Sequence, residues 1–241
     1  MASKTPGIDA RPALASLRRR PQLSEEVAGI LRHKIMTAEF LPGDPIRMDE
    51  TAAELGVSVT PVREALLTLR GEGMVDSAPR RGYVVADMSR TDVEDIFWLQ
   101  GQAAAKIARR TARMIDDDAV TELDAANERL RAEVAAGDPT AISDAEFAFH
   151  RTHNRISRSN KLAWFLLSAT RYTPHQLYAA DPEWAQVALN SHERLIAAYR
   201  ERDPDAAAEA VGRQFTDGAQ RLIEHLAGTD IWSDEEPEPA T

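Results

Sequence analysis

The chain has 241 residues, 43% of them hydrophobic and none of them cysteine, so two separate cores are possible while disulfides, thiolate metal sites and cysteine nucleophiles are excluded. No apolar run approaches the ~20 residues that a membrane span needs, and the N-terminus lacks the apolar core of a signal peptide, so we expect a cytoplasmic protein. The net charge of −10 falls almost entirely on residues 91–241, which hold 27 of the 39 acidic but only 16 of the 29 basic side chains. This asymmetry indicates two domains with different partners. The small net charge of the first 90 residues argues against a protein that coats DNA non-specifically.

The N-terminal segment is expected to form a flexible basic arm followed by a helix. Residues 1–22 show no periodicity and end in a run of arginines at 18–20. Ser24 then has the side chain of a helix N-cap, and the LPGD sequence at 41–44 is expected to end the helix. Helical spacing links the apolar residues that follow Ser24: Val27, Ile30, Leu31 and Ile35.

The segment from residue 48 to residue 70 has the pattern of two short helices joined by a tight turn. The first helix is expected over the sequence DETAAEL, and Gly56 permits the turn that follows. The second helix is expected to begin at Ser58 or Thr60, because Pro61 is tolerated in the first turn of a helix.

The second of these helices has two different faces. Val59, Thr60 and Arg63 lie on one side of its N-terminal end. A DNA recognition helix has this design, because its first residues meet base edges while its other face packs on the protein. The packing face is apolar at helical spacing: Val62, Ala65, Leu66 and Leu69.

A basic hairpin is expected to follow this helix. Gly71 and Gly73 end the helix, and VDSAPRRGYVV is typical of two short strands joined by residues 78–82. Arg80 and Arg81 fall at the tip beside Gly82. A basic loop at this place can reach phosphates or the minor groove.

After residue 90 the pattern is helical almost to the end, without an alternating run. Prolines and capping side chains separate the helices, and Pro174 is expected to kink the fourth of them. Residues 228–241 are acidic and contain proline, so we expect a disordered tail. The expected helices cover residues 91–114, 117–136, 140–157, 160–180, 183–202 and 205–227.

The sequence ELGVSVTPVREALLTLRGEGMV, followed by RRGYVV, resembles the winged helix-turn-helix of the GntR family of bacterial regulators. The helical remainder is similar to the FadR-type branch, whose effector domain is called FCD. The resemblance implies a mainly α fold in two domains. A winged helix-turn-helix with a small β wing would occupy residues 23–88, and an all-helical bundle of about six helices would occupy residues 91–227, where it binds an effector and dimerises.

The resemblance also implies which residues contact DNA. Arg63 is expected to contact a guanine or a phosphate. Ser58 and Thr60 offer hydroxyl groups to the DNA, although either can instead cap the helix. Val59 stands where the family commonly has arginine, so a polar base contact is replaced by contact with a thymine methyl, and a different operator preference is expected. Arg47 either holds a phosphate or remains a solvated surface charge.

FCD domains often hold a metal with an acidic residue, a histidine four positions later and two further histidines. On this resemblance the ligands are Glu146, His150 and His192, with zinc or nickel as the metal. Gln214 occupies the position of the last histidine and is a weak ligand. A metal-free pocket in which these four side chains bind an organic ligand directly is the alternative, and a metal completed by an effector oxygen would reconcile the two.

Three other residues are expected at the effector pocket. Trp98 and Gln102 align with a family arginine and glutamate, so the pocket is less charged than usual. Arg171 remains as an anchor for a carboxylate. His153 and His225 are assigned packing or surface roles.

The sequence therefore predicts a homodimeric transcription regulator, a repressor rather than an activator, that binds a palindromic operator in double-stranded DNA. A small metabolite in the helical domain, with an organic acid as the expected class, would control its operator affinity. The alternatives are a metal-responsive regulator that uses Glu146, His150 and His192, and, more remotely, a metal-dependent hydrolase. No phosphate-binding loop or nucleophile motif favours an enzyme, which would also leave the helix-turn-helix unexplained.

Overall fold

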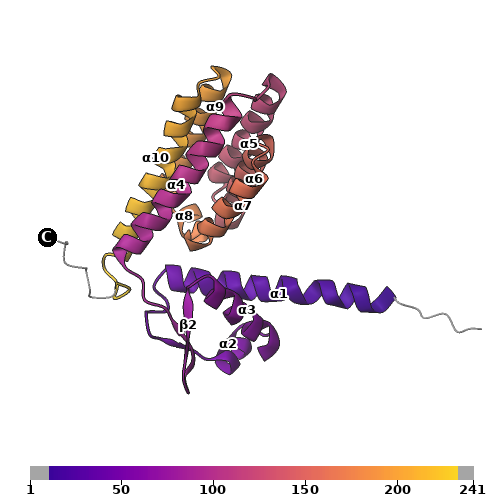
Figure 1. Ribbon diagram of the computed structural model, residues 1–241, viewed down its shortest axis with the longest axis vertical. Coiled ribbons are helices and arrows are strands. Elements are labelled where there is room, and N and C mark those ends of the chain that lie inside the picture. Colours follow the sequence, from indigo (N-terminus) through magenta and orange to yellow (C-terminus); the bar gives the residue numbers. More distant parts are fainter. Residues whose placement is uncertain (1–10, 233–241) are drawn as a thin grey trace, which may run out of the picture. The chain divides into compact units, whose positions relative to one another are not determined.

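The computed structural model describes residues 11–232, which form two compact units. One unit ends at Asp87 and the other begins at Met88, except that Met36–Ala38 group with the second. The described residues contain ten α-helices and one three-stranded antiparallel sheet, in the order shown in Figure 1. The predicted fold class, mainly helical with a small sheet beside the helix-turn-helix, is confirmed. None of the helices within residues 11–232 is long and apolar enough to cross a membrane.

Helix α1 (Arg11–Met36) begins well before the start predicted at Ser24. The structure therefore places a helix where an arm was expected over residues 11–22, while residues 1–10 lie outside the described residues. Local propensity explains the difference, because alanine, leucine and arginine dominate residues 13–20 and are strong helix formers. Val27, Leu31 and Ile35 are buried as their spacing predicts, whereas Ile30 is exposed.

Helices α2 (Met48–Glu54) and α3 (Val59–Gly71) confirm the predicted pair of short helices. Gly56 lies between them in the left-handed conformation, with φ of +66°, which a residue with a side chain adopts only at a cost. Pro61 lies in the first turn of α3. The predicted apolar face of α3 is fully buried at each of its positions: Val62, Ala65, Leu66 and Leu69.

Three short strands complete the first unit: β1 (Pro45–Ile46), β2 (Val75–Ala78) and β3 (Gly82–Val85). Their order in the sheet is β1-β3-β2, with both pairs antiparallel. The β2–β3 hairpin confirms the predicted wing. Strand β1 is not predicted by the sequence, because two residues are too few to show an alternating pattern.

The second unit is helical, and most of its helices begin at predicted breaks. Asp138, Asp181 and Asp203 each accept hydrogen bonds from backbone N–H groups in the first turn of a helix, and a proline follows each aspartate. Ser89 and Asp92 form a capping box at the first helix of the unit. The five long helices are α4 (Arg90–Ala112), α5 (Asp117–Ala136), α6 (Pro139–Ile156), α9 (Pro182–Arg200) and α10 (Pro204–Leu226).

The helix predicted over residues 160–180 is broken rather than kinked. It forms α7 (Asn160–Ala169), a 3-10 turn (Thr170–Tyr172) and α8 (His175–Ala179). Pro174 causes the break because it drives Thr173 into an extended conformation, with φ of −95° and ψ of 119°, and lacks the N–H that would continue the helix. The unit therefore has seven α-helices among its described residues instead of about six.

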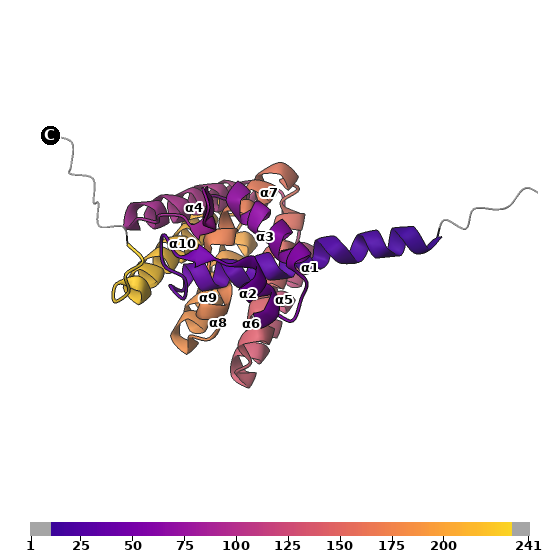
Figure 2. The same ribbon diagram turned by 90° about the horizontal axis from the view of Figure 1, so that it is seen from below.

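Helices α4 and α10 lie side by side along their length in both views (Figures 1 and 2). Helix α9 packs against α10, and α5 packs against both α6 and α9. The core of the unit is apolar and includes Ile107, Leu123, Phe149 and Tyr199. Ile231 is buried after α10, so the chain is still packed beyond residue 228; residues 233–241 of the predicted tail lie outside the described residues.

Candidate functional site

The N-terminal end of α3 presents polar side chains to solvent. Ser58, Thr60 and Arg63 are exposed, and Val59 is half-buried. Ser58 occupies the N-cap position, but its side chain makes no capping hydrogen bond. The burial of the opposite face fixes the orientation of α3, so these four side chains share the outward end of the helix. This is the arrangement that base-edge contact in a major groove requires.

The other predicted DNA-contacting residues lie on the same unit. Arg80, Arg81 and Gly82 are exposed at the β2–β3 turn, where Arg80 and Gly82 both have positive φ. The Arg81 guanidinium donates to the Gly43 carbonyl over 3.2 Å. Arg47 is exposed and pairs with Glu50 at 3.0 Å, so a phosphate contact would have to exchange that partner. The role of each residue in DNA binding stays a prediction.

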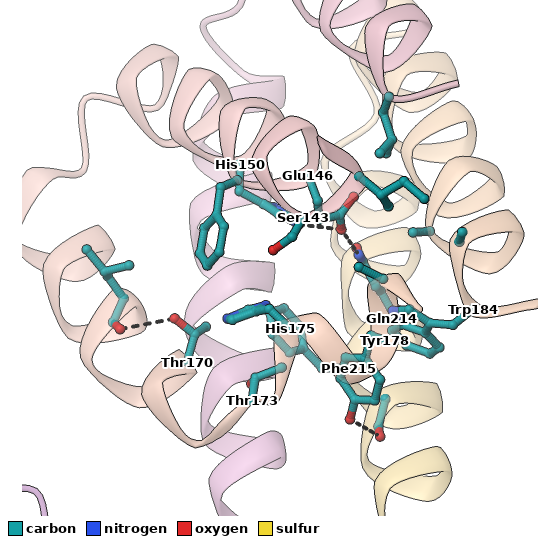
Figure 3. A pocket seen from close by; sticks show the side chains of 18 of the residues that line it. Ser143, Glu146, His150, Thr170, Thr173, His175, Tyr178, Trp184, Gln214 and Phe215 are labelled. Atoms are coloured by element: carbon teal, nitrogen blue, oxygen red, sulfur yellow. Dashed lines mark hydrogen bonds and ion pairs between the residues drawn. The ribbon is translucent and has the colours of Figure 1, made fainter. Parts of the chain in front are cut away.

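The second unit encloses a cavity of about 120 Å³, shown in Figure 3. Helices α4, α6, α9 and α10 and the α7–α8 segment supply most of its lining, and α5 adds Leu130. Apolar and aromatic side chains dominate, among them Phe97, Phe147, Trp184 and Phe215. The polar lining side chains are Ser143, Glu146, His150, Asn154, Thr170, Thr173, His175, Tyr178 and Gln214.

Glu146 is the centre of the polar part of this cavity. Its Oε1 interacts with His150 Nε2 at 3.2 Å and accepts a hydrogen bond from Gln214 Nε2 at 3.1 Å, as Figure 3 shows. His192 Nε2 lies 3.6 Å from the same oxygen. Glu146 Oε2 and His192 Nε2 are buried without a hydrogen-bond partner. The structure thus brings four of the predicted residues together and leaves two buried acceptor atoms unsatisfied.

His192 is held in a fixed orientation behind Glu146. Its Nδ1 lies 3.1 Å from Asn127 Oδ1, and its ring stacks on Phe149 with centroids 3.6 Å apart. Burial lowers the pKa of His192 to about 4, against the opposing effect of Glu146, so the imidazole is neutral near pH 7. Because Nδ1 donates to Asn127, Nε2 carries the lone pair that a metal or a donor would meet.

Glu146 is held in its charged form. Burial raises the pKa of the Glu146 carboxyl group, but His192 and the hydrogen bond with His150 together outweigh burial and lower the pKa to about 2. One oxygen of Glu146 and one nitrogen each of His150 and His192 lie within 4.8 Å of one another. These are the residues that could hold a metal ion, and among the described residues they form the only such group.

Three residues expected at the pocket lie elsewhere. Trp98 and Gln102 are exposed and border a groove between α4 and α10 instead of the cavity. The inward face of α4 carries the buried residues Phe97 and Gln100. Trp98 follows Phe97 by one residue and therefore points outward. Arg171 is exposed on the 3-10 turn, because the break before Pro174 ends the helix that would have presented it.

Several cavity residues escape prediction from the sequence. Asn127, which holds His192 but does not line the cavity, has a visible signal, since it is a polar residue on the otherwise apolar face of α5 formed by Leu123, Ala126 and Leu130. His175 and Tyr178 belong to α8, whose position depends on the break at Pro174. His153 is buried and bonded to Tyr199, and His225 is exposed, which fits the packing and surface roles expected for them.

Known proteins resemble the chain along most of its length. The HTH-type transcriptional repressor RspR of Escherichia coli is 23% identical over 89% of this chain and 95% of its own. The gluconate operon transcriptional repressor of Bacillus licheniformis is 27% identical over 86% of this chain and 87% of its own. The solved structure of E. coli McbR/YncC covers 84% of this chain and 97% of that protein, with 22% identity and a TM-score of 0.64, which supports the fold.

Family models match both units separately. Residues 23–85 match the bacterial regulatory proteins of the gntR family, and residues 101–217 match the FCD domain. The first match contains the helix-turn-helix and wing, and the second contains all of the polar cavity residues. The chain therefore belongs to the GntR family of bacterial transcriptional regulators, with an N-terminal DNA-binding unit and a C-terminal FCD domain.

Proposed function

We propose that the chain is a repressor that acts in the cytoplasm, binds a palindromic operator as a homodimer, and loses operator affinity when a small ligand occupies the FCD cavity. Repression is favoured because RspR and the gluconate operon regulator are both named as repressors. The observation that carries the proposal is the outward end of α3, where Ser58, Thr60 and Arg63 are exposed above a fully buried face.

The charge balance of the first unit and the side chains of α3 both favour sequence-specific over non-specific DNA binding. The first 90 residues carry almost balanced charge, so phosphate neutralisation alone supplies little affinity. Base-edge contacts from Arg63 must then supply much of the specificity, and a bidentate arginine–guanine pair is worth about 1–3 kcal/mol. A single α3 reads only a few base pairs, so two copies related by a two-fold axis require a palindrome.

Ligand control follows from linkage between the two units. A ligand reduces operator affinity only if it binds the DNA-free state more tightly than the DNA-bound state. The cavity of about 120 Å³ is the place for such a ligand, because it combines an apolar lining with a few convergent polar groups.

Selection of bound sequences from random duplex DNA tests the proposal. Wild type should enrich one palindromic motif, and Arg63→Ala should lose the motif or relax it at one position in each half-site. Arg70→Ala is the matched control, because Arg70 is exposed at the other end of the same helix. Wild-type enrichment without a palindrome, or equal motifs for wild type and Arg63→Ala, would count against this use of α3.

A metal-responsive regulator is the second candidate. Glu146, His150 and His192 fit a divalent cation such as zinc or nickel, because their ligand atoms converge and two of these residues keep a buried acceptor without a partner. A bound cation would supply the positive charge that an organic acid needs as an anchor. Gln214 weighs against a complete ligand set, since its amide donates to Glu146.

Metal analysis of protein purified without chelator or nickel resin tests this candidate. Stoichiometric metal that is lost in His150→Ala but kept in His225→Ala would support it. His225 is the control because it is exposed on α10 and does not belong to the group of converging ligand atoms. No bound metal, and no change in melting temperature with added zinc or nickel, would rule it out.

A further inference from the structure

We propose that the FCD cavity binds a compact, ring-sized and mainly apolar molecule that bears an amine or hydroxyl group and no carboxylate. The inference rests on the proposed ligand control of this unit and names the chemical class of the ligand. It departs from the organic acid that the family resemblance implies.

The size and lining of the cavity set the body of the ligand. A volume of about 120 Å³ is close to that of the ~150 Å³ apolar cavity that binds benzene in an engineered protein. Phe97, Phe147, Trp184 and Phe215 supply aromatic surface. The hydroxyl of Tyr178 is already used, since it donates to the Gly218 carbonyl over 2.7 Å. Most of the lining is apolar, so a sugar acid or polyol would place part of its hydroxyl groups against carbon atoms, which is costly.

The charges at the cavity wall set the polar group of the ligand. Glu146 is the only acidic side chain in the lining, and no lysine or arginine accompanies it among the described lining residues. Arg171, the cation expected to anchor a carboxylate, is exposed and does not line the cavity. A carboxylate placed beside Glu146 would bring two negative charges together in a poorly hydrated space, which is unfavourable.

Glu146 also has an unused capacity to accept a hydrogen bond. Oε1 has His150 and Gln214 as partners, whereas Oε2 has none although it is buried. An ammonium or hydroxyl group donates a hydrogen bond to such an acceptor, and a carboxylate has no proton to donate.

Three probes with the same ring separate the possibilities: benzylamine, benzyl alcohol and benzoate. Binding to full-length, chelator-dialysed protein is measured by calorimetry and thermal shift. We expect benzylamine and benzyl alcohol to bind, with benzoate and gluconate at least about tenfold weaker, because only the first two can donate a hydrogen bond to the charged Glu146. A tenfold difference corresponds to about 1.4 kcal/mol.

Variants locate the binding. Glu146→Gln should weaken benzylamine about tenfold or more and benzyl alcohol less, while Glu224→Gln, at an exposed position of α10, should change neither. Ala188→Leu should fill the cavity and reduce binding of every probe, whereas Ala197→Leu, on the exposed face of the same helix, should not. Melting curves show whether each variant is folded, and Glu146→Gln carries the test if Ala188→Leu does not fold.

Two outcomes overturn the inference. One is benzoate or gluconate binding as tightly as benzylamine, including the case in which benzoate binds only after zinc is added, which would indicate a metal-anchored acid. The other is no binding of any of the three ring probes. Operator selection with the same protein separates this failure from that of the proposed function, because a palindromic motif recovered in the absence of probe binding leaves the repressor proposal intact.

Discussion

At the scale of single residues, the buried histidines of the FCD domain make its stability depend on pH. Burial lowers the pKa of His153 to about 3, with the nearby His150 and His192 acting in the same direction. The unfolded chain keeps the ordinary value of 6.5 and therefore takes up the proton first. The stabilisation is fully present above about pH 6.5 and is lost as the pH falls toward 3, by at most about 1.4 kcal/mol per pH unit for each histidine.

Thermal melts between about pH 7 and pH 5 check this prediction. The melting temperature of wild type should fall over this range, and His153→Gln should show a shallower fall because it removes one titrating group. His225→Gln should keep the wild-type slope, since His225 is exposed. Equal slopes for wild type and His153→Gln would show that the protonation of His153 does not limit stability.

Only part of the arrangement of the cavity residues could be predicted from the sequence. Glu146 and His150 share a helix face at i and i+4, so their proximity follows from geometry, whereas their approach to His192 and Gln214 required the family resemblance. Trp98 and Gln102 lie on the outward face of α4, and because a helix rotates by about 100° per residue, Phe97 and Trp98 face different ways although they are neighbours in the sequence. The binding roles of all these residues stay predictions.

At the scale of elements, a buried ion pair ties α1 to the end of α3. Arg32 Nε donates to Glu72 Oε2 over 2.6 Å and Nη2 donates to Oε1 over 2.8 Å, with side chains 10% and 9% exposed. Arg32 also pairs with Glu25 at 3.0 Å, so Glu72 is the buried half of a small cluster of charges. Breaking a buried pair by removing one partner costs up to about 3–5 kcal/mol. Arg32→Met should therefore destabilise the DNA-binding unit by this order and weaken operator binding.

A double-mutant cycle in chemical denaturation measures the pair. Arg32→Met/Glu72→Leu should be more stable than the sum of the single variants predicts, because both substitutions remove the same two hydrogen bonds. Lys34→Met is the comparison on the same helix: its pair with Glu54 is partly exposed and is worth about 0–1 kcal/mol. Strict additivity of the two single variants would contradict the coupling between α1 and α3.

Helix starts can be predicted from local sequence, whereas the short strand β1 cannot. The Asp-Pro pairs at 138–139, 181–182 and 203–204 mark helix starts because both residues act within one turn. Strand β1 depends on β3, which is about forty residues away in the sequence, so nothing local reveals it. At Pro174 the sequence predicts the disturbance but not its size, because a kink and a break differ in how neighbouring helices pack.

At the scale of the whole molecule, α4 has a surface that is complementary to itself. Trp98 and Leu99 are 65% and 53% exposed near its middle, and α7, which packs against α4, adds Trp164 and Phe165 at 60% and 63%. Large exposed apolar side chains on two helices that pack against each other are typical of an interface. The exposed stripe along α4 runs from acidic to basic: Asp95, Leu99, Gln102, Lys106, Arg109 and Arg113.

A second copy of the chain would meet this surface if two α4 helices ran antiparallel across a two-fold axis at Gln102. Asp95 and Arg109 are equally far from Gln102 along the helix, so each acidic end of α4 then faces a basic end of the partner. The apolar middle is buried at the same time. We therefore predict that α4 forms the interface of the proposed homodimer.

Reversal of charge tests this interface by sedimentation or light scattering over a dilution series. Asp95→Arg should raise the dimer dissociation constant at least about tenfold, because it places like charges together on both sides of the axis. Asp95→Arg/Arg109→Asp should restore the dimer even though it removes the exposed pair of Arg109 with Asp205, which is worth about 0–1 kcal/mol. Asp144→Arg, on the exposed face of α6, should leave the dimer unchanged. If Asp95→Arg dimerises like wild type, α4 is not the interface. If both variants are monomers, the pairing of two α4 helices about Gln102 is wrong. Loss of operator binding in such monomers would still indicate that two copies of the chain read the operator.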